Sequence, residues 1–293
     1  MTLPLLLLLG SGLCTALCGV VFSRAAKDEI DGAAVLLVSS FLAAAAGLAC
    51  FPDYGNLGKV SIWLVAAVFV AGLLCAGGLL LVTMAMREGH HGLAWTVSQS
   101  CLLWPPLVCA AWFGETLGLA GATGLLAMLG GIACVGLGKG VGEPPTNRFW
   151  LLQALAAFVL FGVQQTLLTL PSRVEALRDV CHLRVPVLQT ACALVYASVW
   201  LARGRPSLRR ALPLGMALGG CVVANFWLLF LGLDGLGVLG LAGIGYPVMV
   251  GSCVVLFGLY SAVVLRERLA PLQALGTTTI IFGLTLLAWP HGK

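Results

Sequence analysis

The side chains best suited to chemistry in this sequence are uncharged polar groups inside long apolar runs. The run at 92–113 carries the richest set: Trp95 and Gln99 stand one helical turn apart, and Thr96 and Ser100 form a neighbouring stripe. Because lipid offers no hydrogen bonds, such groups are expected to face a polar cavity or another helix. We take these four residues as candidates for binding a substrate. The alternative is that they bond one helix to the next.

Four further residues extend this candidate site into later runs of the chain. Gln164, Asn225, Tyr246 and Ser252 are polar positions in otherwise apolar surroundings. Tyr246 is equally compatible with the membrane interface, where tyrosine is enriched. Gln165 adjoins Gln164, and adjacent side chains on a helix diverge. One glutamine is therefore expected to face the cavity and the other a neighbouring helix.

The apolar runs lack the groups that catalysis or ATP hydrolysis requires. All eleven carboxylates fall at or beyond the ends of the runs. His90 and His91 stand beside Glu88 without the spacing of a zinc site. The glycine that a phosphate-binding loop needs before Lys139 is replaced by Ala133. We expect no catalytic residue, no metal and no cofactor. The alternatives left open are a membrane-embedded enzyme acting on lipid-linked or peptide substrates, and a non-transporting membrane scaffold.

The elements that must position these residues are about ten membrane-spanning helices. The chain is 60% hydrophobic and 9% charged, with a mean hydropathy of +1.04, whereas a soluble domain is about 45–50% apolar and about 25% charged. A spanning helix needs about 20 apolar residues. Suitable runs lie at 3–22, 33–51, 60–86, 92–113, 117–138, 149–170, 185–202, 211–233, 235–265 and 269–290. The run at 235–265 begins glycine-rich, so its helix is expected to start near Ile244.

The charged residues indicate a multi-pass protein of the cell membrane rather than a nucleic-acid binder. The net charge of +5 comes from basic residues scattered between the apolar runs. The densest group, Arg203, Arg205, Arg209 and Arg210, is typical of a cytoplasmic anchor beside a helix end. The expected partners are the lipid bilayer and a small-molecule substrate.

An internal repeat divides the chain into two halves of five helices, at 1–140 and 148–290. A shift of 152 residues aligns three pairs of residues that are scarce or small: Glu115 with Glu267, Gly124 with Gly276, and Gly131 with Gly283. An odd number of spans inverts the second half relative to the first, as in many secondary transporters. The paired glycines are expected to allow close helix packing. An internally duplicated chain supplies both halves, which is compatible with a functional monomer.

The segments around the aligned glutamates resemble a known family. Gly114-Glu115-Thr116-Leu117 and Arg266-Glu267-Arg268-Leu269 look like the Gly-Glu-Arg-Leu-like box that follows helices four and nine in the EamA-type branch of the drug/metabolite transporter superfamily. The first box departs from the family form at Thr116. The resemblance covers nearly the whole chain. It implies a ten-helix permease with cytoplasmic termini and a central cavity lined mainly by helices three, four, eight and nine. The distribution of Lys and Arg favours the opposite orientation, with the termini outside, because most basic residues, including Arg203 to Arg210, fall in the loops on the side away from the termini.

The repeat and the resemblance together predict a secondary, non-ATP transporter of small polar metabolites such as amino acids or sugars, working by alternating access. The first run carries only Ser11, Thr15 and cysteines as polar groups. We therefore expect a neutral, zwitterionic or anionic substrate rather than a lipophilic cation. Glu115 and Glu267 are expected to cap the helices that follow them, where the helix dipole favours a negative charge. Proton coupling or gating is the alternative role for this pair.

Overall fold

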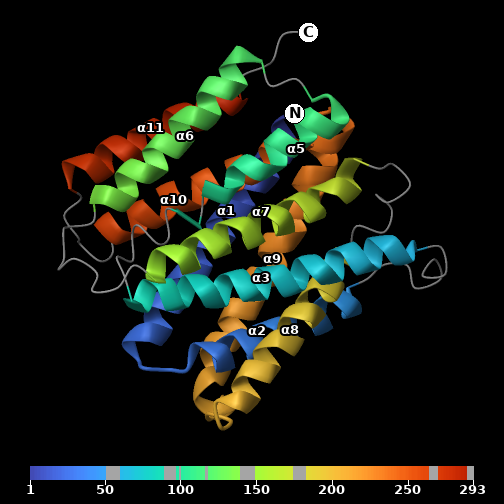
Figure 1. Ribbon diagram of the computed structural model, residues 1–293, viewed down its shortest axis with the longest axis vertical. Helices are drawn as coiled ribbons and strands as arrows, with labels where there is room; N and C mark the ends of the chain where they lie inside the picture. The colour runs from blue at the N-terminus through green and yellow to red at the C-terminus, as the bar shows by residue number, and fades with distance from the viewer. Residues whose placement is uncertain are drawn as a thin grey trace.

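The computed structural model of the chain is a bundle of α-helices joined by short segments (Figure 1). The structure describes residues 1–50, 60–88, 97–98, 100–115, 118–138, 149–173, 183–263 and 270–288. Within these ranges there are ten α-helices and no β-strand. The predicted all-α fold class is therefore confirmed.

The described residues of the first half of the chain form five α-helices. They are α1 (Thr2–Lys27), α2 (Gly32–Ala49), α3 (Ile62–Glu88), α5 (Trp104–Phe113) and α6 (Leu119–Gly138). A 3₁₀ segment, η2 (Ser100–Leu103), leads into α5. Pro105 and Pro106 follow in the first turn of α5, where a missing N–H costs no helical hydrogen bond. Gly114 ends α5 with φ of 64°, a left-handed conformation that favours glycine.

The second half forms five more. They are α7 (Phe149–Arg173), α8 (Arg184–Ala202), α9 (Leu208–Val238), α10 (Gly245–Val263) and α11 (Pro271–Ala288), with the 3₁₀ segment η4 (Ala242–Ile244) before α10. The helix expected to start near Ile244 begins one residue later, at Gly245. The glycine-rich stretch before it makes the turn from α9, where Gly240 adopts a positive φ of 73°.

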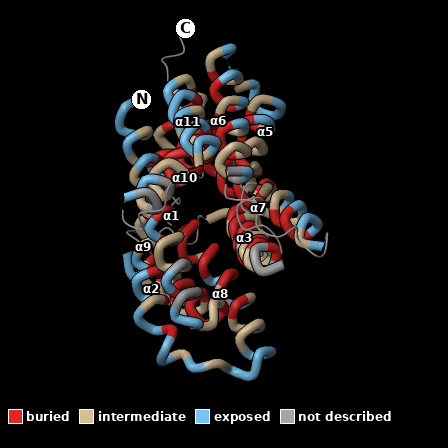
Figure 2. The backbone as a smooth tube through the Cα atoms, turned by 90° about the vertical axis from the view of Figure 1, so that its left-hand side faces the viewer, coloured by how far each residue is buried: buried red, intermediate tan, exposed pale blue. Residues whose placement is uncertain are grey.

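Six of the described helices, α1, α2, α3, α7, α8 and α9, are long and apolar enough to cross a membrane. The other four contain shorter apolar stretches, at 100–113, 119–135, 242–257 and 271–287. Large apolar side chains such as Leu3, Phe41 and Trp63 are exposed. The buried residues lie mostly where the helices face one another (Figure 2). The chain is thus a helical membrane protein.

The helices of one half pack mainly against those of the other. Each main contact between a helix of the first half and one of the second has an equivalent contact between their counterparts. The first helix of the first half, α1, lies against α9, and the first helix of the second half, α7, lies against α3 (Figure 1). In the same way α2 packs on α9 while α8 packs on α3. The counterparts α2 and α8 pack on each other, as do α6 and α11.

The helices α6 and α11 meet through the glycines that the repeat aligns. A Cβ added to Gly124 would lie 2.8 Å from the carbonyl oxygen of Gly283, and one added to Gly131 would lie 2.7 Å from that of Gly276. The early glycine of each helix thus faces the late glycine of the other, so the two helices run antiparallel. The predicted role of these glycines in close packing is confirmed.

Candidate functional site

A cavity of about 160 Å³ lies between α1, α3, α7, α9 and α10. It contains polar groups from both halves of the chain, set among aromatic and aliphatic side chains. Its lining residues include Thr15, Gln164, Gln165, Asn225, Tyr246 and Met249. Of these, Gln164, Asn225 and Tyr246 were predicted as site residues, and the cavity brings them together.

Asn225 is held in a fixed orientation by hydroxyl groups of α1. Ser11 Oγ donates a hydrogen bond to Asn225 Oδ1 at 2.6 Å, and Thr15 Oγ1 lies 3.0 Å from the same oxygen. Because Oδ1 accepts from these hydroxyls, the Nδ2 amino group is the part of the amide left for other partners. Asn225 Nδ2 makes no hydrogen bond with the described residues.

Both adjacent glutamines of α7 line the cavity, whereas one was expected to face a neighbouring helix. Gln165 does both, because it also bonds Cys101 of η2. Side chains about 100° apart on one helix can border the same space when that space is as wide as a ligand. Gln165 Nε2 donates to Cys101 Sγ at 3.1 Å, while its Oε1 is buried without a partner. The Gln164 amide makes no hydrogen bond with the described residues and is only 5% exposed.

Tyr246 lies in the wall of the cavity and not in an interfacial belt. The residue is 2% exposed, and its hydroxyl is buried without a hydrogen-bond partner. A buried hydroxyl left in this way costs about 1–3 kcal/mol. Tyr246 and Gln165 therefore give the cavity wall two unsatisfied polar atoms.

Ser252 is not among the residues that line this cavity and contacts the neighbouring helix α1 instead. Its Oγ donates to Met249 O of its own helix at 2.9 Å. The same hydroxyl sits against Gly12 of α1, where any added Cβ would clash. Ser100 begins η2 and is not among the residues that line the cavity. The predicted candidates Trp95, Thr96, Gln99 and Glu267 lie outside the described residues.

The helices that line the cavity differ in part from those implied by the family resemblance. The third, eighth and ninth helices, α3, α9 and α10, contribute Cys75, Asn225 and Tyr246 as implied. The first and sixth, α1 and α7, contribute as well, through Thr15 and Gln164. The described part of the fourth helix does not line the cavity. The reason lies in the packing, since α1 runs beside both α9 and α10.

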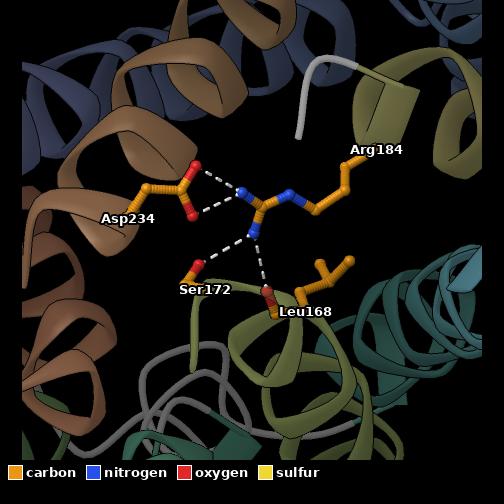
Figure 3. A network of polar contacts seen from close by, with 4 residues as sticks. All are labelled: Leu168, Ser172, Arg184 and Asp234. Carbon is orange, nitrogen blue, oxygen red and sulfur yellow. Dashed lines mark hydrogen bonds and ion pairs between the residues drawn. The ribbon is translucent and has the colours of Figure 1, made fainter. Parts of the chain in front are cut away.

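A buried arginine, paired with a partly buried aspartate, joins α7, α8 and α9. The Arg184 side chain is 1% exposed. One of its terminal nitrogens, Nη2, donates to both carboxylate oxygens of Asp234 at 2.7 Å (Figure 3). The other, Nη1, donates to Ser172 Oγ at 2.9 Å and to Leu168 O at 3.2 Å. The guanidinium also stacks over the ring of Phe230, 4.4 Å from its centroid.

A second ion pair lies beside the first. Arg173 Nε is 3.0 Å from Glu115 Oε1, although the angle is not that of a hydrogen bond. Glu115 Oε2 accepts from the backbone N–H of Gly243 in η4 at 3.1 Å. Burial raises the pKa of the Glu115 carboxyl above its usual value, against the opposing effects of Gly243, Arg173 and the backbone of Ala242.

Glu115 therefore stabilises a helical segment of the other half and not the helix that follows it. The sequence predicts that Glu115 caps α6, whereas its bonds go to η4 and to Arg173. The start of η4 offers unpaired N–H groups that a carboxylate can accept from, because 3₁₀ segments also begin with orphan donors. This contact is one that sequence spacing cannot reveal, since Glu115 and Gly243 are far apart in the chain.

Asp234 corrects the expectation that every carboxylate lies at or beyond a helix end. It stands inside α9, which continues to Val238, and it pairs with the first residue of α8. The apolar residues on both sides of Asp234 indicate a buried carboxylate, and an isolated charge in such surroundings requires a partner of opposite charge. Ser11 and Thr15 were noted as polar groups of the first run, but their bonds to Asn225 were not expected.

The comparisons with known proteins add information about the fold alone. No family model matches the chain, and no curated protein matches it. A solved structure described only as the crystal structure of a protein is similar to this chain, with a TM-score of 0.68 over 98% of each chain and 18% sequence identity. At this identity the likeness shows a shared arrangement of helices. The fold therefore occurs, over its whole length, in a solved structure.

Proposed function

We propose that this protein is a secondary, non-ATP transporter that carries small polar metabolites across the cell membrane by alternating access. The observation that carries the proposal is the cavity, where amides of α7 and α9 meet a hydroxyl of α1. The lining groups are amides, hydroxyls, thiols and apolar side chains. Such groups suit reversible binding better than acid–base catalysis, which needs a titratable pair. Amino acids, sugars and related compounds are the proposed substrate classes.

The packing of the helices supports an inverted repeat, and with it a carrier. In the contact between α6 and α11, Gly124 faces Gly283 and Gly131 faces Gly276. The sequence aligns Gly124 with Gly276 and Gly131 with Gly283, so replacing each glycine of one contact by its aligned counterpart gives the other contact. This reciprocal pattern is typical of a two-fold relation between equivalent units. Secondary transporters with inverted repeats bind their substrate between the two halves.

The likeness of the two Glu-containing boxes to the EamA-type branch of the drug/metabolite transporter superfamily supports the same function. In that interpretation all ten helices cross the membrane, including α5, α6, α10 and α11. The Glu115 box makes the contact between halves that alternating access requires, because Glu115 belongs to the first half and its partners Arg173 and Gly243 to the second. For the cavity to open at this end, those contacts must separate.

A flux experiment tests the proposal. Proteoliposomes are loaded with a defined mixture of amino acids, sugars and uncharged heterocycles, and the contents are followed by mass spectrometry. We expect selective loss of one or a few compounds from vesicles that contain the protein. The Asn225→Leu variant should retain them, since it removes the amide that α1 orients. Unselective leakage, or equal retention by vesicles with and without the protein, would reject the proposal.

The matched control for this experiment is Gln153→Leu. Gln153 is a third buried amide of α7, beside Gln164 and Gln165, and both of its polar atoms lack partners. It does not line the cavity and precedes Gln164 by about three helical turns. Flux through Gln153→Leu should equal that of the unmodified protein.

A further inference from the structure

The cavity retains free polar groups that define what a ligand must offer. The Gln164 carboxamide has an oxygen and an amino group without partners, and Asn225 has a free Nδ2 among the described residues. Tyr246 and Gln165 add an unpaired hydroxyl and an unpaired Oε1 in the wall. Buried polar groups of native proteins are nearly always hydrogen-bonded. A molecule that satisfies these groups must present both an acceptor and a donor.

The size of the cavity limits the ligand to about one ring. Pockets for drug-sized molecules measure about 300–1,000 Å³, whereas this cavity measures about 160 Å³. An engineered apolar cavity of about 150 Å³ holds one molecule of benzene. Phe161, Phe226, Val250 and Val254 give the cavity apolar walls of the kind that a ring packs against.

The charges around the cavity favour a neutral ligand. No residue that lines it, among those the structure describes, is a Lys, Arg, Asp or Glu. The neighbouring Arg184 and Asp234 satisfy each other through a bidentate contact at 2.7 Å. A carboxylate or an ammonium group in the cavity would lose its hydration without gaining a counter-charge.

We propose that the cavity binds an uncharged, single-ring molecule that carries a carboxamide or lactam. Its C=O accepts from Asn225 Nδ2, its N–H donates to Gln164 Oε1, and its ring packs against Phe161 and Phe226. The inference rests on the proposed function in taking this cavity as the substrate site. It narrows the substrate from small polar metabolites in general to uncharged amides.

Four probes of one shape test the inference by calorimetry on the purified full-length protein. They are benzamide, benzoate, benzamidinium and acetophenone. The first three differ in charge, and acetophenone keeps the acceptor while it lacks the donor. We expect benzamide to bind at least tenfold more tightly than either ion, and several-fold more tightly than acetophenone. This comparison uses the unmodified protein, so it does not depend on the folding of any variant.

Variants then locate the binding. Asn225→Leu and Gln164→Leu should each weaken benzamide binding at least tenfold, while Gln153→Leu should leave it unchanged. Equal or tighter binding of benzoate or benzamidinium would overturn the inference, as would no binding of any probe. If benzamide binds in the cavity but no compound is carried selectively in proteoliposomes, the inference about the ligand holds and the transport proposal fails. If only charged compounds are carried selectively, the transport proposal is supported and uncharged amides are rejected as the substrate class.

Discussion

Arg173 of the second half lies 3.0 Å from Glu115 of the first half, measured from Nε to Oε1, and both side chains are largely buried. Because Glu115 also accepts from Gly243 of η4, one carboxylate ties the segment after α5 to both α7 and η4. The contact thus joins the two halves through a pair of opposite charges. Its energetics should therefore depend on the protonation of Glu115.

The first prediction concerns Arg173→Met. The change leaves the buried Glu115 carboxylate without its cation, which typically costs about 3–5 kcal/mol. Burial raises the pKa of Glu115 in the folded state. The protonated carboxyl is therefore tolerated fully below the usual pKa, and this contribution to the free energy of unfolding is lost as pH rises through the raised pKa. The penalty should thus be large at pH 8 and small near pH 4.5, as measured by thermal unfolding in detergent.

Two controls accompany this prediction. Arg24→Met removes the cation of an exposed i,i+4 pair with Asp28, so it should change stability little at any pH. Adding Glu115→Gln to Arg173→Met removes both charges and should restore most of the lost stability. A penalty for Arg173→Met that is the same at both pH values would contradict this account of the pair.

The second prediction concerns the hydrogen bonds around Arg184. Ser172→Ala removes the hydroxyl that accepts from Arg184 Nη1, and a bond to a charged group contributes about 1.5–3 kcal/mol. Asp234→Asn should cost more, because it leaves a fully buried guanidinium without its counter-charge. Ser198→Ala is the control, since that exposed hydroxyl donates to Leu194 O within its own helix. Equal unfolding midpoints for the two alanine variants would contradict the prediction.

The third prediction compares neighbouring glycines of α6. A Cβ on Gly131 would lie 2.6–2.9 Å from Ile280 and Gly276 of α11, whereas one on Gly130 would meet nothing within 4 Å. Gly131→Ala should therefore destabilise the protein by about 1–3 kcal/mol through overpacking. Gly130→Ala should be neutral or stabilising, because alanine favours a helix by up to about 1 kcal/mol. Thermal unfolding of both variants in one detergent makes the comparison, and the reverse order of stability would refute the packing.

The fourth prediction separates stability from function at the cavity. Tyr246→Phe removes a buried hydroxyl that has no partner, so the ligand-free protein should be as stable or more stable. The same change should lower the selective flux, because it removes a polar group of the cavity wall. Gln153→Leu also removes unpartnered polar atoms and should keep full flux. A Tyr246→Phe variant with reduced stability and full flux would contradict the assigned role.

Much of the fold could be predicted from the sequence because the bilayer restricts what a spanning segment contains. Charge-free runs located nine of the ten described α-helices to within about five residues at each end, and the glycine-rich stretch before Ile244 marked the break between α9 and α10. The run at 92–113 was located less well, because α5 begins only at Trp104, after the 3₁₀ segment η2. The glycines Gly124, Gly131, Gly276 and Gly283 pack α6 against α11, as expected of small residues. Local composition was sufficient to place the helices and the break, since each depends on residues close together in the chain, whereas the contact between Gly124 and Gly283 joins distant segments and was not predicted.

The candidate site was predicted only in part, because its partners come from distant segments. The scarcity of polar groups identified Gln164, Asn225 and Tyr246, which do line the cavity. The same argument misplaced Ser252, whose hydroxyl bonds within its own helix. The rarity of polar residues in an apolar run identifies candidates, but it does not predict which side chains they contact.

The Arg184–Asp234 ion pair also could not be predicted from the sequence, because it joins distant segments. Arg184 and Asp234 are separated by 50 positions, and each lies near a helix end, where a charge is usually solvated. Only the packing of α8 against the end of α9 turns these two positions into a buried pair.

The most direct test of transport by alternating access is counterflow in proteoliposomes. Vesicles are preloaded with an excess of the unlabelled compound that the flux screen identifies, and a trace of the labelled compound is added outside. A carrier that exposes one site to each side in turn should accumulate the label transiently above its external concentration, and Asn225→Leu should abolish this overshoot. Entry of the label without any overshoot would indicate a channel or a leak and would contradict the account.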